Sequence, residues 1–159
     1  MSHVNQALAR FQKQIVVEEG PSEWHTVTQG QINDFADTTY DHQFIHVDVE
    51  RAKKETPFGG TIAHGFLTLS MLPHLQEKLT PADPAVYEGL AMGINYGLDK
   101  VRFPNPVRVE SRIRARRELV SADEVAPNTL QLKQKVTIEI DGEAKPACVA
   151  EALTRLIYS

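Results

Sequence analysis

Asp41 and His46 are the first residues whose types and spacing could do chemistry. They lie five positions apart, in a segment where Phe44 and Ile45 place apolar side chains beside them. On a helix this spacing would turn the two side chains about 140° apart, so a loop must bring them together. A carboxylate and an imidazole that meet in a poorly solvated pocket can hold a water and remove its proton. The structural alternative is an Asx turn at Asp41 and a packing role for His46.

His64 and Gly65 add a second part, because they stand at the start of a strongly apolar stretch that the pattern predicts to be helical. The free N–H groups and the positive dipole end of such a helix can stabilise an oxyanion. Glycine at position 65 also has no side chain to block the approach to its own amide. The structural alternatives are tight packing at Gly65 and a hydrogen bond from His64 to a loop carbonyl.

A buried central helix is the element that must position both parts. Gly59 and Gly60 lead into a stretch that carries apolar residues on most sides, namely Ile62, Phe66, Leu67, Leu69, Met71, Leu75 and Leu79. This pattern predicts one helix of about five turns with a sheet curled around it. Pro73 lies inside the stretch and is expected to kink the helix or restart it.

The sheet comes mainly from strands that follow this helix. Strand patterns cover residues 90–98, 107–116 and 130–140, and residues 147–158 return after Asp141-Gly142, a pair typical of a tight hairpin. With a short strand at 24–27, about five mostly antiparallel strands are expected, which is an α+β class with the sheet wrapped round the helix. Further helices are predicted at 5–15 behind an Asn5 cap, at 28–40 behind Thr28, and after Asp48.

Composition narrows the class of protein. The 159 residues, 42% of them hydrophobic, predict one domain over residues 1–159 with the 5–15 helix packed on it. A net charge of -4 gives no general attraction to nucleic acid or anionic membrane. Without a long apolar run or a basic N-terminal leader pattern, the expected location is the cytoplasm. The single Cys148 excludes an internal disulfide, and its apolar neighbours predict an inert buried thiol. A small sheet leaves an edge exposed, so a homodimer is expected.

Two motifs at a suitable separation carry a resemblance to a known family. They are Phe35-Ala36-x-x-x-x-Asp41-x-x-x-x-His46-x-Asp48 and Pro57-Phe58-Gly59-x-x-Ile62-Ala63-His64-Gly65-x-Leu67-Thr68-Leu69. Together they resemble the signature of the MaoC-like, R-specific enoyl-CoA hydratases. The flanking segments Trp24-His25-Thr26-Val27 and Asn95-Tyr96-Gly97-x-Asp99-x-Val101-Arg102-Phe103-Pro104 resemble the nodulation-protein-N-like branch more closely. The resemblance covers about residues 20 to 120.

The resemblance implies a hot-dog fold and a hydratase that interconverts trans-2-enoyl thioesters and (R)-3-hydroxyacyl thioesters. By matching position, Asp41 and His46 would activate the water, and the Gly65 amide would hold the thioester oxygen. Candidate contacts to the coenzyme A or acyl-carrier-protein thioester are Gln43, Phe44, His64, Asn95 and Arg102. No metal and no redox cofactor are expected. One departure from the family pattern is Gln43-Phe44, where Asn-Pro is common, so the rigid turn of that proline is lost.

Rival interpretations stay open at this point. The same fold hosts acyl-CoA thioesterases, which use a carboxylate near the same helix end without the Asp-His pair, and a non-catalytic acyl-thioester-binding protein would bind and turn nothing over. A metal site could use His42-x-x-x-His46 with Asp41 and Asp48, although the segment is not expected to be helical. A run of basic residues could contact coenzyme A phosphates or form a solvated strand face; it comprises Lys100, Arg102, Arg108, Arg112, Arg114, Arg116 and Arg117.

Overall fold

The structure is a computed structural model that describes all residues from 1 to 159. The helices are α1 (His3–Gln12), α2 (Gln29–Thr39), α3 (Phe44–Val47), α4 (Val49–Glu55), α5 (Gly65–Ser70), α6 (Leu72–Glu77) and the short 3-10 helix η1 (Pro84–Tyr87). The strands are β1 (Glu18–Glu19), β2 (His25–Thr26), β3 (Leu90–Arg102), β4 (Arg112–Ala126), β5 (Thr129–Ile140) and β6 (Cys148–Tyr158).

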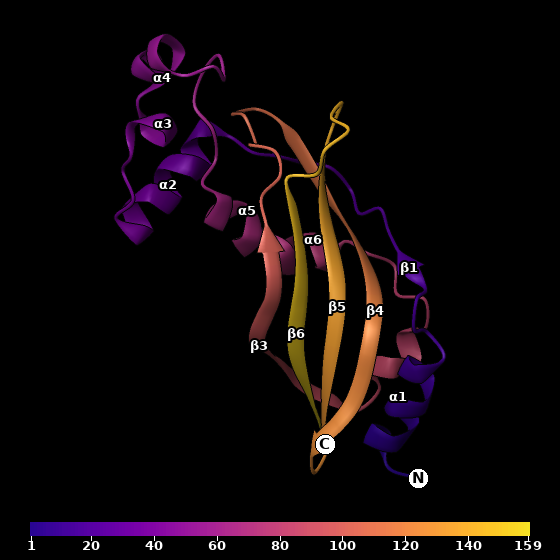
Figure 1. The fold of residues 1–159 in the computed structure, drawn as a ribbon. Helices are drawn as coiled ribbons and strands as arrows, with labels where there is room; N and C mark the ends of the chain where they lie inside the picture. Colours follow the sequence, from indigo (N-terminus) through magenta and orange to yellow (C-terminus); the bar gives the residue numbers. More distant parts are fainter.

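The strands form one six-stranded sheet in the order β1-β4-β5-β6-β3, with β2 also paired to β4. Every pairing between named strands is antiparallel. Figure 1 shows the four long strands side by side, with α5 and α6 behind them and α2, α3 and α4 gathered beyond one end of the sheet. The predicted α+β class with an antiparallel sheet is therefore confirmed.

Alternation along β4 and β5 places the core, because successive side chains of a strand point to opposite faces. Ile113 and Ala115 on β4 are fully buried, and so are Val136 and Ile138 on β5. These residues pack with α2, α5 and α6 in the larger of two apolar clusters. Cys148 belongs to the same cluster, and burial raises the pKa of its thiol to about 11. This environment agrees with the prediction that Cys148 is a buried, unreactive thiol.

The central apolar stretch forms two short helices, and the expectation of a single long helix is wrong. The first helix, α5, ends at Ser70 and α6 begins at Leu72. Pro73 explains the break, because a proline has no backbone N–H to donate inside a helix but is tolerated in its first turn. The alternative that Pro73 restarts the helix is confirmed.

Predicted helix boundaries are wrong at the N-terminus. The first helix starts at His3, and the hydroxyl of Ser2, not the side chain of Asn5, accepts the capping hydrogen bond. The capping prediction at Thr28 is confirmed, since its side chain accepts from the N–H of Gln31 at 3.2 Å. Asp48 likewise caps α4 through the N–H of Arg51 at 3.0 Å.

Two strand predictions also need correction. The strand predicted at 107–116 begins only at Arg112, because Val107 and Val109 pair with residues 61–63 and Glu110 adopts a left-handed φ of 67°. The hairpin at Asp141-Gly142 is not a two-residue turn, since β6 starts only at Cys148. Gly142 still supplies the positive φ of 78° that this turn requires.

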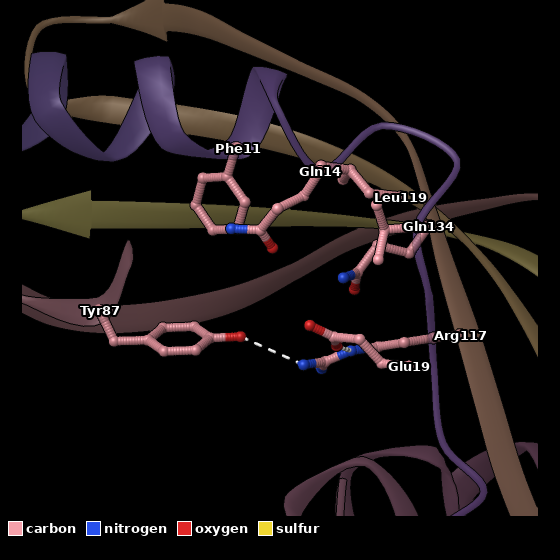
Figure 2. Close-up of a pocket in the computed structure, with 8 residues that line it drawn as sticks. Phe11, Gln14, Glu19, Tyr87, Arg117, Leu119 and Gln134 are labelled. Atoms are coloured by element: carbon pink, nitrogen blue, oxygen red, sulfur yellow. Dashed lines mark hydrogen bonds and ion pairs between the residues drawn. The ribbon is translucent and has the colours of Figure 1, made fainter. Parts of the chain in front are cut away.

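A smaller apolar cluster packs α1 on the sheet, and a buried ion pair lies beside two of its members, Phe11 and Leu119 (Figure 2). The guanidinium of Arg117 on β4 donates from Nε to Glu19 on β1 and from Nη2 to the hydroxyl of Tyr87 at 3.3 Å. The side chains of Arg117 and Glu19 are only 10% and 11% exposed. This pair therefore joins the N-terminal segment to the centre of the sheet.

The free edge of the sheet is β3, and it carries a row of exposed apolar side chains. Met92, Ile94, Tyr96 and Leu98 are between 45% and 55% exposed. A hollow of about 680 Å³ lies beside this edge, between β3, β6 and the α5–α6 pair. None of the helices combines the length and the apolar character that a membrane span requires.

Candidate active site

Asp41 and His46 are positioned by a tight sequence of turns between α2 and α4. The first turn is left-handed at Tyr40, with φ of 61°, which ends α2. The carboxylate of Asp41 then accepts from the N–H of Gln43 at 3.3 Å, as in the Asx turn of the structural alternative. Contrary to the expected loop, Phe44–Val47 is one helical turn. Asp41 remains outside that turn, so the two side chains can still converge.

His46 is only 7% exposed, and both its ring and its backbone carbonyl are hydrogen-bonded. Its Nδ1 lies 2.7 Å from the carbonyl oxygen of Ile62, so Nδ1 carries the proton and donates. The other ring nitrogen, Nε2, then keeps a lone pair that can accept a proton. Gln29 at the start of α2 donates to the carbonyl of His46 at 2.8 Å and accepts from the hydroxyl of Thr61.

His64 lies directly against His46, with ring centroids 3.8 Å apart and planes 25° from parallel. Its Nε2 donates to the backbone carbonyl of Asp41 at 2.9 Å, which is the loop-carbonyl bond of the structural alternative. The side-chain nitrogen or oxygen atoms of Asp41, His46 and His64 lie within 4.8 Å of one another. The convergence predicted for Asp41 and His46 is present, and His64 joins them.

The electrostatic environment favours the neutral form of His46. Burial lowers the pKa of its imidazole below the usual 6.5, and the neighbouring His64 lowers it further. The hydrogen bond to Ile62 and the charge of Asp41 act in the opposite direction without reversing the shift. A neutral imidazole beside a carboxylate is an arrangement that can accept a proton near neutral pH.

Gly65 is the first residue of α5, and its N–H donates no hydrogen bond within the chain. The ring of Phe103, which follows β3, lies against this glycine: a Cβ at position 65 would meet ring atoms at 3.1 to 3.2 Å. The packing alternative for Gly65 is therefore realised. The unused N–H also leaves a donor for a ligand oxygen at the helix start.

The same three side chains could also act as metal ligands, since one ligand atom of each lies within 4.8 Å of the others. One nitrogen of each ring already donates to a carbonyl, so each imidazole keeps a single lone pair for an ion. Two imidazoles and one carboxylate would supply three of the four ligands of a tetrahedral ion. His42 does not join the cluster, because its Nε2 lies 2.8 Å from the carboxylate of Asp37.

Other candidate contacts lie around this centre rather than in it. Gln43 is exposed before α3, and the Phe44 ring lies 3.9 Å below the guanidinium of Arg51. Asn95 lines the hollow beside β3, near the C-terminal half of α5. Arg102 is exposed at the end of β3 and donates to the carbonyl of Val101.

The basic run divides into two groups. Arg112, Arg114, Arg116 and Arg117 pair with carboxylates of Asp141, Glu139, Glu18 and Glu19. Lys100, Arg102 and Arg108 form no ion pair in the chain. The strand-face interpretation holds for Arg112, Arg114 and Arg116, while Arg117 is buried. Only the second group is free of carboxylates and can contact phosphates.

Several residues of the site were missed from the sequence. Gln29 and Thr61 hold the backbone of His46 through bonds that cross 17 and 32 positions of the chain. Phe103 covers Gly65 from a segment that follows β3. The only sequence signal for the first two is polar side chains next to buried positions, which is too common to select them.

Comparisons with known proteins add to this geometry. Residues 10–140 match the family described as the MaoC like domain. The chain is 51% identical over 138 residues to 3-hydroxyacyl-thioester dehydratase Z of Mycobacterium tuberculosis, covering 87% of each chain. It is 48% identical over 148 residues to nodulation protein N of Rhizobium leguminosarum bv. viciae, covering 93% of this chain and 89% of that protein.

Solved structures share the fold. A monoamine oxidase regulatory protein from Archaeoglobus fulgidus superposes with a TM-score of 0.71 at 25% identity, covering 92% of both chains. An (R)-hydratase from A. caviae, described as involved in PHA biosynthesis, superposes with a TM-score of 0.63 at 22% identity, covering 85% of this chain and 95% of that one. The predicted hot-dog fold is thereby confirmed.

Proposed function

Because the chain belongs to the family of MaoC-like dehydratase domains, we propose that it interconverts trans-2-enoyl thioesters and (R)-3-hydroxyacyl thioesters by adding or removing water. The observation that carries this proposal is that side-chain ligand atoms of Asp41 and His46 lie within 4.8 Å of each other and of His64, the residue before the unused N–H of Gly65. The name of the mycobacterial relative, a 3-hydroxyacyl-thioester dehydratase, supports the same substrate class.

In the hydration reaction, Asp41 and His46 transfer the proton and the N–H of Gly65 stabilises negative charge. The oxygen of water forms a bond to C3 of the enoyl group while Asp41 and His46 take up one proton of that water. The π electrons of the C2=C3 bond move towards the thioester, whose oxygen gains negative charge. The N–H of Gly65 donates to this oxygen and stabilises it. The proton held by the pair then passes to C2, and the same steps in reverse remove water.

The chemistry of this proposal requires no redox cofactor, since the oxidation of C3 by its new bond to oxygen is balanced by the reduction of C2 by its new bond to hydrogen. The base, the water and the N–H donor are sufficient for the proton transfers. We therefore assign no metal or redox cofactor to the reaction. The coenzyme A or acyl-carrier-protein thioester enters as substrate.

The free cations support a place for the phosphates of that carrier. Arg102 and Lys100 stand just before Phe103, which lies against Gly65, and Arg108 pairs with Ile62 shortly before the same helix start. A thioester whose carbonyl reaches Gly65 would extend its phosphate-bearing arm towards these unpaired cations. Gln43 and Phe44, which lie between Asp41 and His46 in the chain, remain candidates for contacts to the acyl chain.

We also propose that the active protein is a homodimer joined along β3. The strand is long, lies at the edge of the sheet and exposes apolar side chains on it, which is a surface that a second copy can cover. Phe66 on α5 adds to this surface at 69% exposure.

The experiment is an enoyl-thioester hydration assay with purified protein and crotonyl-CoA or longer trans-2-enoyl-CoA. Loss of the enoyl absorbance should be accompanied by formation of the (R)-3-hydroxyacyl product, identified by chiral analysis. Release of free coenzyme A at the same rate would instead indicate thioester hydrolysis, the rival enzyme. Tight binding of enoyl-CoA and hydroxyacyl-CoA without any turnover would favour a non-catalytic binding protein and contradict the proposal.

A further inference from the structure

His64 is the residue of the site whose contacts the proposed chemistry does not yet use. It is only 2% exposed, and it contacts the residues to which the three reacting groups belong. Its Nε2 donates to the backbone carbonyl of Asp41, its ring face stacks on His46, and its own peptide unit leads directly into the N–H of Gly65.

The hydrogen bonds assign the tautomers of both rings. A carbonyl oxygen can only accept, so His64 carries its proton on Nε2 and His46 carries its proton on Nδ1. The remaining lone pairs are therefore on Nδ1 of His64 and Nε2 of His46. Nδ1 of His64 is buried and has no hydrogen-bond partner.

A buried acceptor without a donor is unfavourable, and a purely structural residue would avoid it. A phenylalanine could stack against His46 and Phe35 without leaving a polar atom unpaired. A histidine at this position therefore needs a reason beyond packing. The hydrogen bond to the Asp41 carbonyl, which a phenylalanine cannot donate, supplies that reason.

We propose that His64 is a positioning residue, which holds the Asp41 backbone and the His46 ring in the arrangement that lets both act on one water. This inference rests on the proposed hydratase function. Without the ring of His64, the loop after α2 loses its anchor to the helix start at Gly65, and His46 loses the surface that fixes its plane. A displacement of about 1 Å between reacting groups is enough to lower a rate strongly.

The pKa of His46 provides a second way to test the positioning role of His64, because it depends on the charged groups around the ring. Asp41 from the loop after α2 and His64 from the start of α5 are the titratable groups that act on its charge. Other nearby groups are engaged elsewhere, since Asp37 on α2 pairs with His42 and Asp48 caps α4. Burial is the main reason that the pKa of His46 is lowered, and replacing the imidazole of His64 by a phenyl ring removes the second, smaller contribution while it leaves a stacking partner in place.

The experiment compares His64→Phe, which keeps a flat ring, with His64→Asn, which keeps a donor for the Asp41 carbonyl. His74→Phe is the matched control, because His74 is an exposed histidine that also contacts another imidazole, that of His25, away from the site. Steady-state kinetics on enoyl-CoA and an NMR titration of the His46 ring are measured for each folded variant.

Both His64 variants should lower kcat at least about tenfold with little change in KM, whereas His74→Phe should match the wild type. In His64→Phe, the His46 titration should also move to higher pH. The NMR result does not depend on turnover, so it tests this inference even if the wild type hydrates no enoyl thioester. Wild-type kcat in both variants would overturn the proposal, and so would an unchanged His46 titration in His64→Phe.

Discussion

Asp41 and His46 act as a pair only if each contributes a property that the other lacks. The carboxylate is exposed and can exchange protons with solvent, while the imidazole is buried, neutral and fixed by the carbonyl of Ile62. Removing either one should leave a group that can bind water but not deprotonate it efficiently. We predict that Asp41→Asn and His46→Ala each lower kcat by about 10² or more with the fold intact.

The matched control for this pair is Asp37→Asn. Asp37 is an exposed carboxylate on α2 that pairs with His42, so its loss removes a similar charge close to the site. The control should keep near-normal turnover. If Asp41→Asn were as active as Asp37→Asn, Asp41 would have no part in the mechanism. Circular dichroism of all three variants separates a lost fold from a lost step.

The lowered pKa of His46 predicts how activity and stability change with pH. A base must be neutral to accept a proton, so kcat/KM should stay level as pH falls to 6.5 and decline only below it. The unfolded chain binds a proton at this residue near pH 6.5, while the folded chain binds it only at lower pH. His46 therefore contributes fully to stability above pH 6.5. This contribution is lost as the pH falls from 6.5 through the lower pKa of His46 in the folded chain.

Paired measurements check the sign of this effect. Urea unfolding at pH 7.5 and 5.5 should show a larger loss of stability for the wild type than for His46→Gln, whose side chain does not titrate. The acid limb of kcat/KM is measured over the same range with enoyl-CoA. An acid limb centred above 6.5 would contradict a lowered pKa at His46.

Gly65 has two possible reasons to be glycine, and they can be separated. A Cβ there would press on the Phe103 ring, yet Phe103 is 41% exposed and can shift. We predict that Gly65→Ala lowers kcat at least about tenfold, because the added methyl group crowds the amide that receives the thioester oxygen. Adding Phe103→Leu should relieve the crowding with the ring without restoring turnover. Full recovery of kcat in the double variant would instead assign Gly65 to packing alone.

At the residue scale, the sequence identifies the residues that could carry the chemistry better than the residues that hold them in place. The Asp41–His46 spacing, the glycine at the helix start and the resemblance to a family all indicate a proton-transfer site. The bonds from Gln29 and Thr61 and the stacking of His64 on His46 depend on long-range packing. No periodicity or cap signal encodes contacts between residues 17 to 32 positions apart.

Two helix caps, whose sequence signals lie within a few residues, are predicted correctly from the sequence. Strand ends, which depend on the backbone that the strand pairs with, are not. The caps at Thr28 and Asp48 were correct because the bonding atoms lie within three residues of each other. The start of β4 was wrong because Val107 and Val109 alternate like a strand but pair with residues 61–63, not with β5. Strand patterns report which side chains are buried and not which backbone they meet.

One buried charge pair, together with the pairing of β1 and β4, attaches the N-terminal segment to the sheet. Glu19→Ala would leave the guanidinium of Arg117, which donates to Glu19 and Tyr87, without its counter-charge (Figure 2). We predict a loss of about 3 kcal/mol in the free energy of unfolding, measured by urea denaturation. Glu19→Gln keeps an acceptor and should lose less. A loss below about 1 kcal/mol for Glu19→Ala would mean that the pair behaves like an exposed one.

At the scale of the whole molecule, polar and apolar side chains are distributed unevenly over the surface of the sheet. Most of the face of β4 and β5 that lies away from the core is polar, whereas β3 ends the sheet with a row of exposed apolar side chains. Edge strands of this length and character pair with another chain unless charges or bulges prevent it. The register shifts in β3 interrupt its pairing with β6 at three places, and the strand still presents an extended edge of 13 residues.

A second copy along β3 would bury this row, and a charge placed in it should prevent the contact. We predict that Ile94→Asp weakens the dimer at least about tenfold, because the carboxylate would be desolvated in the interface. Val120→Asp on β4 is the matched control, since Val120 is 41% exposed and Ile94 47%. Light scattering over a range of protein concentrations distinguishes the two. A wild type that is monomeric throughout, or an Ile94→Asp variant that dimerises as strongly as Val120→Asp, would remove β3 as the dimer contact.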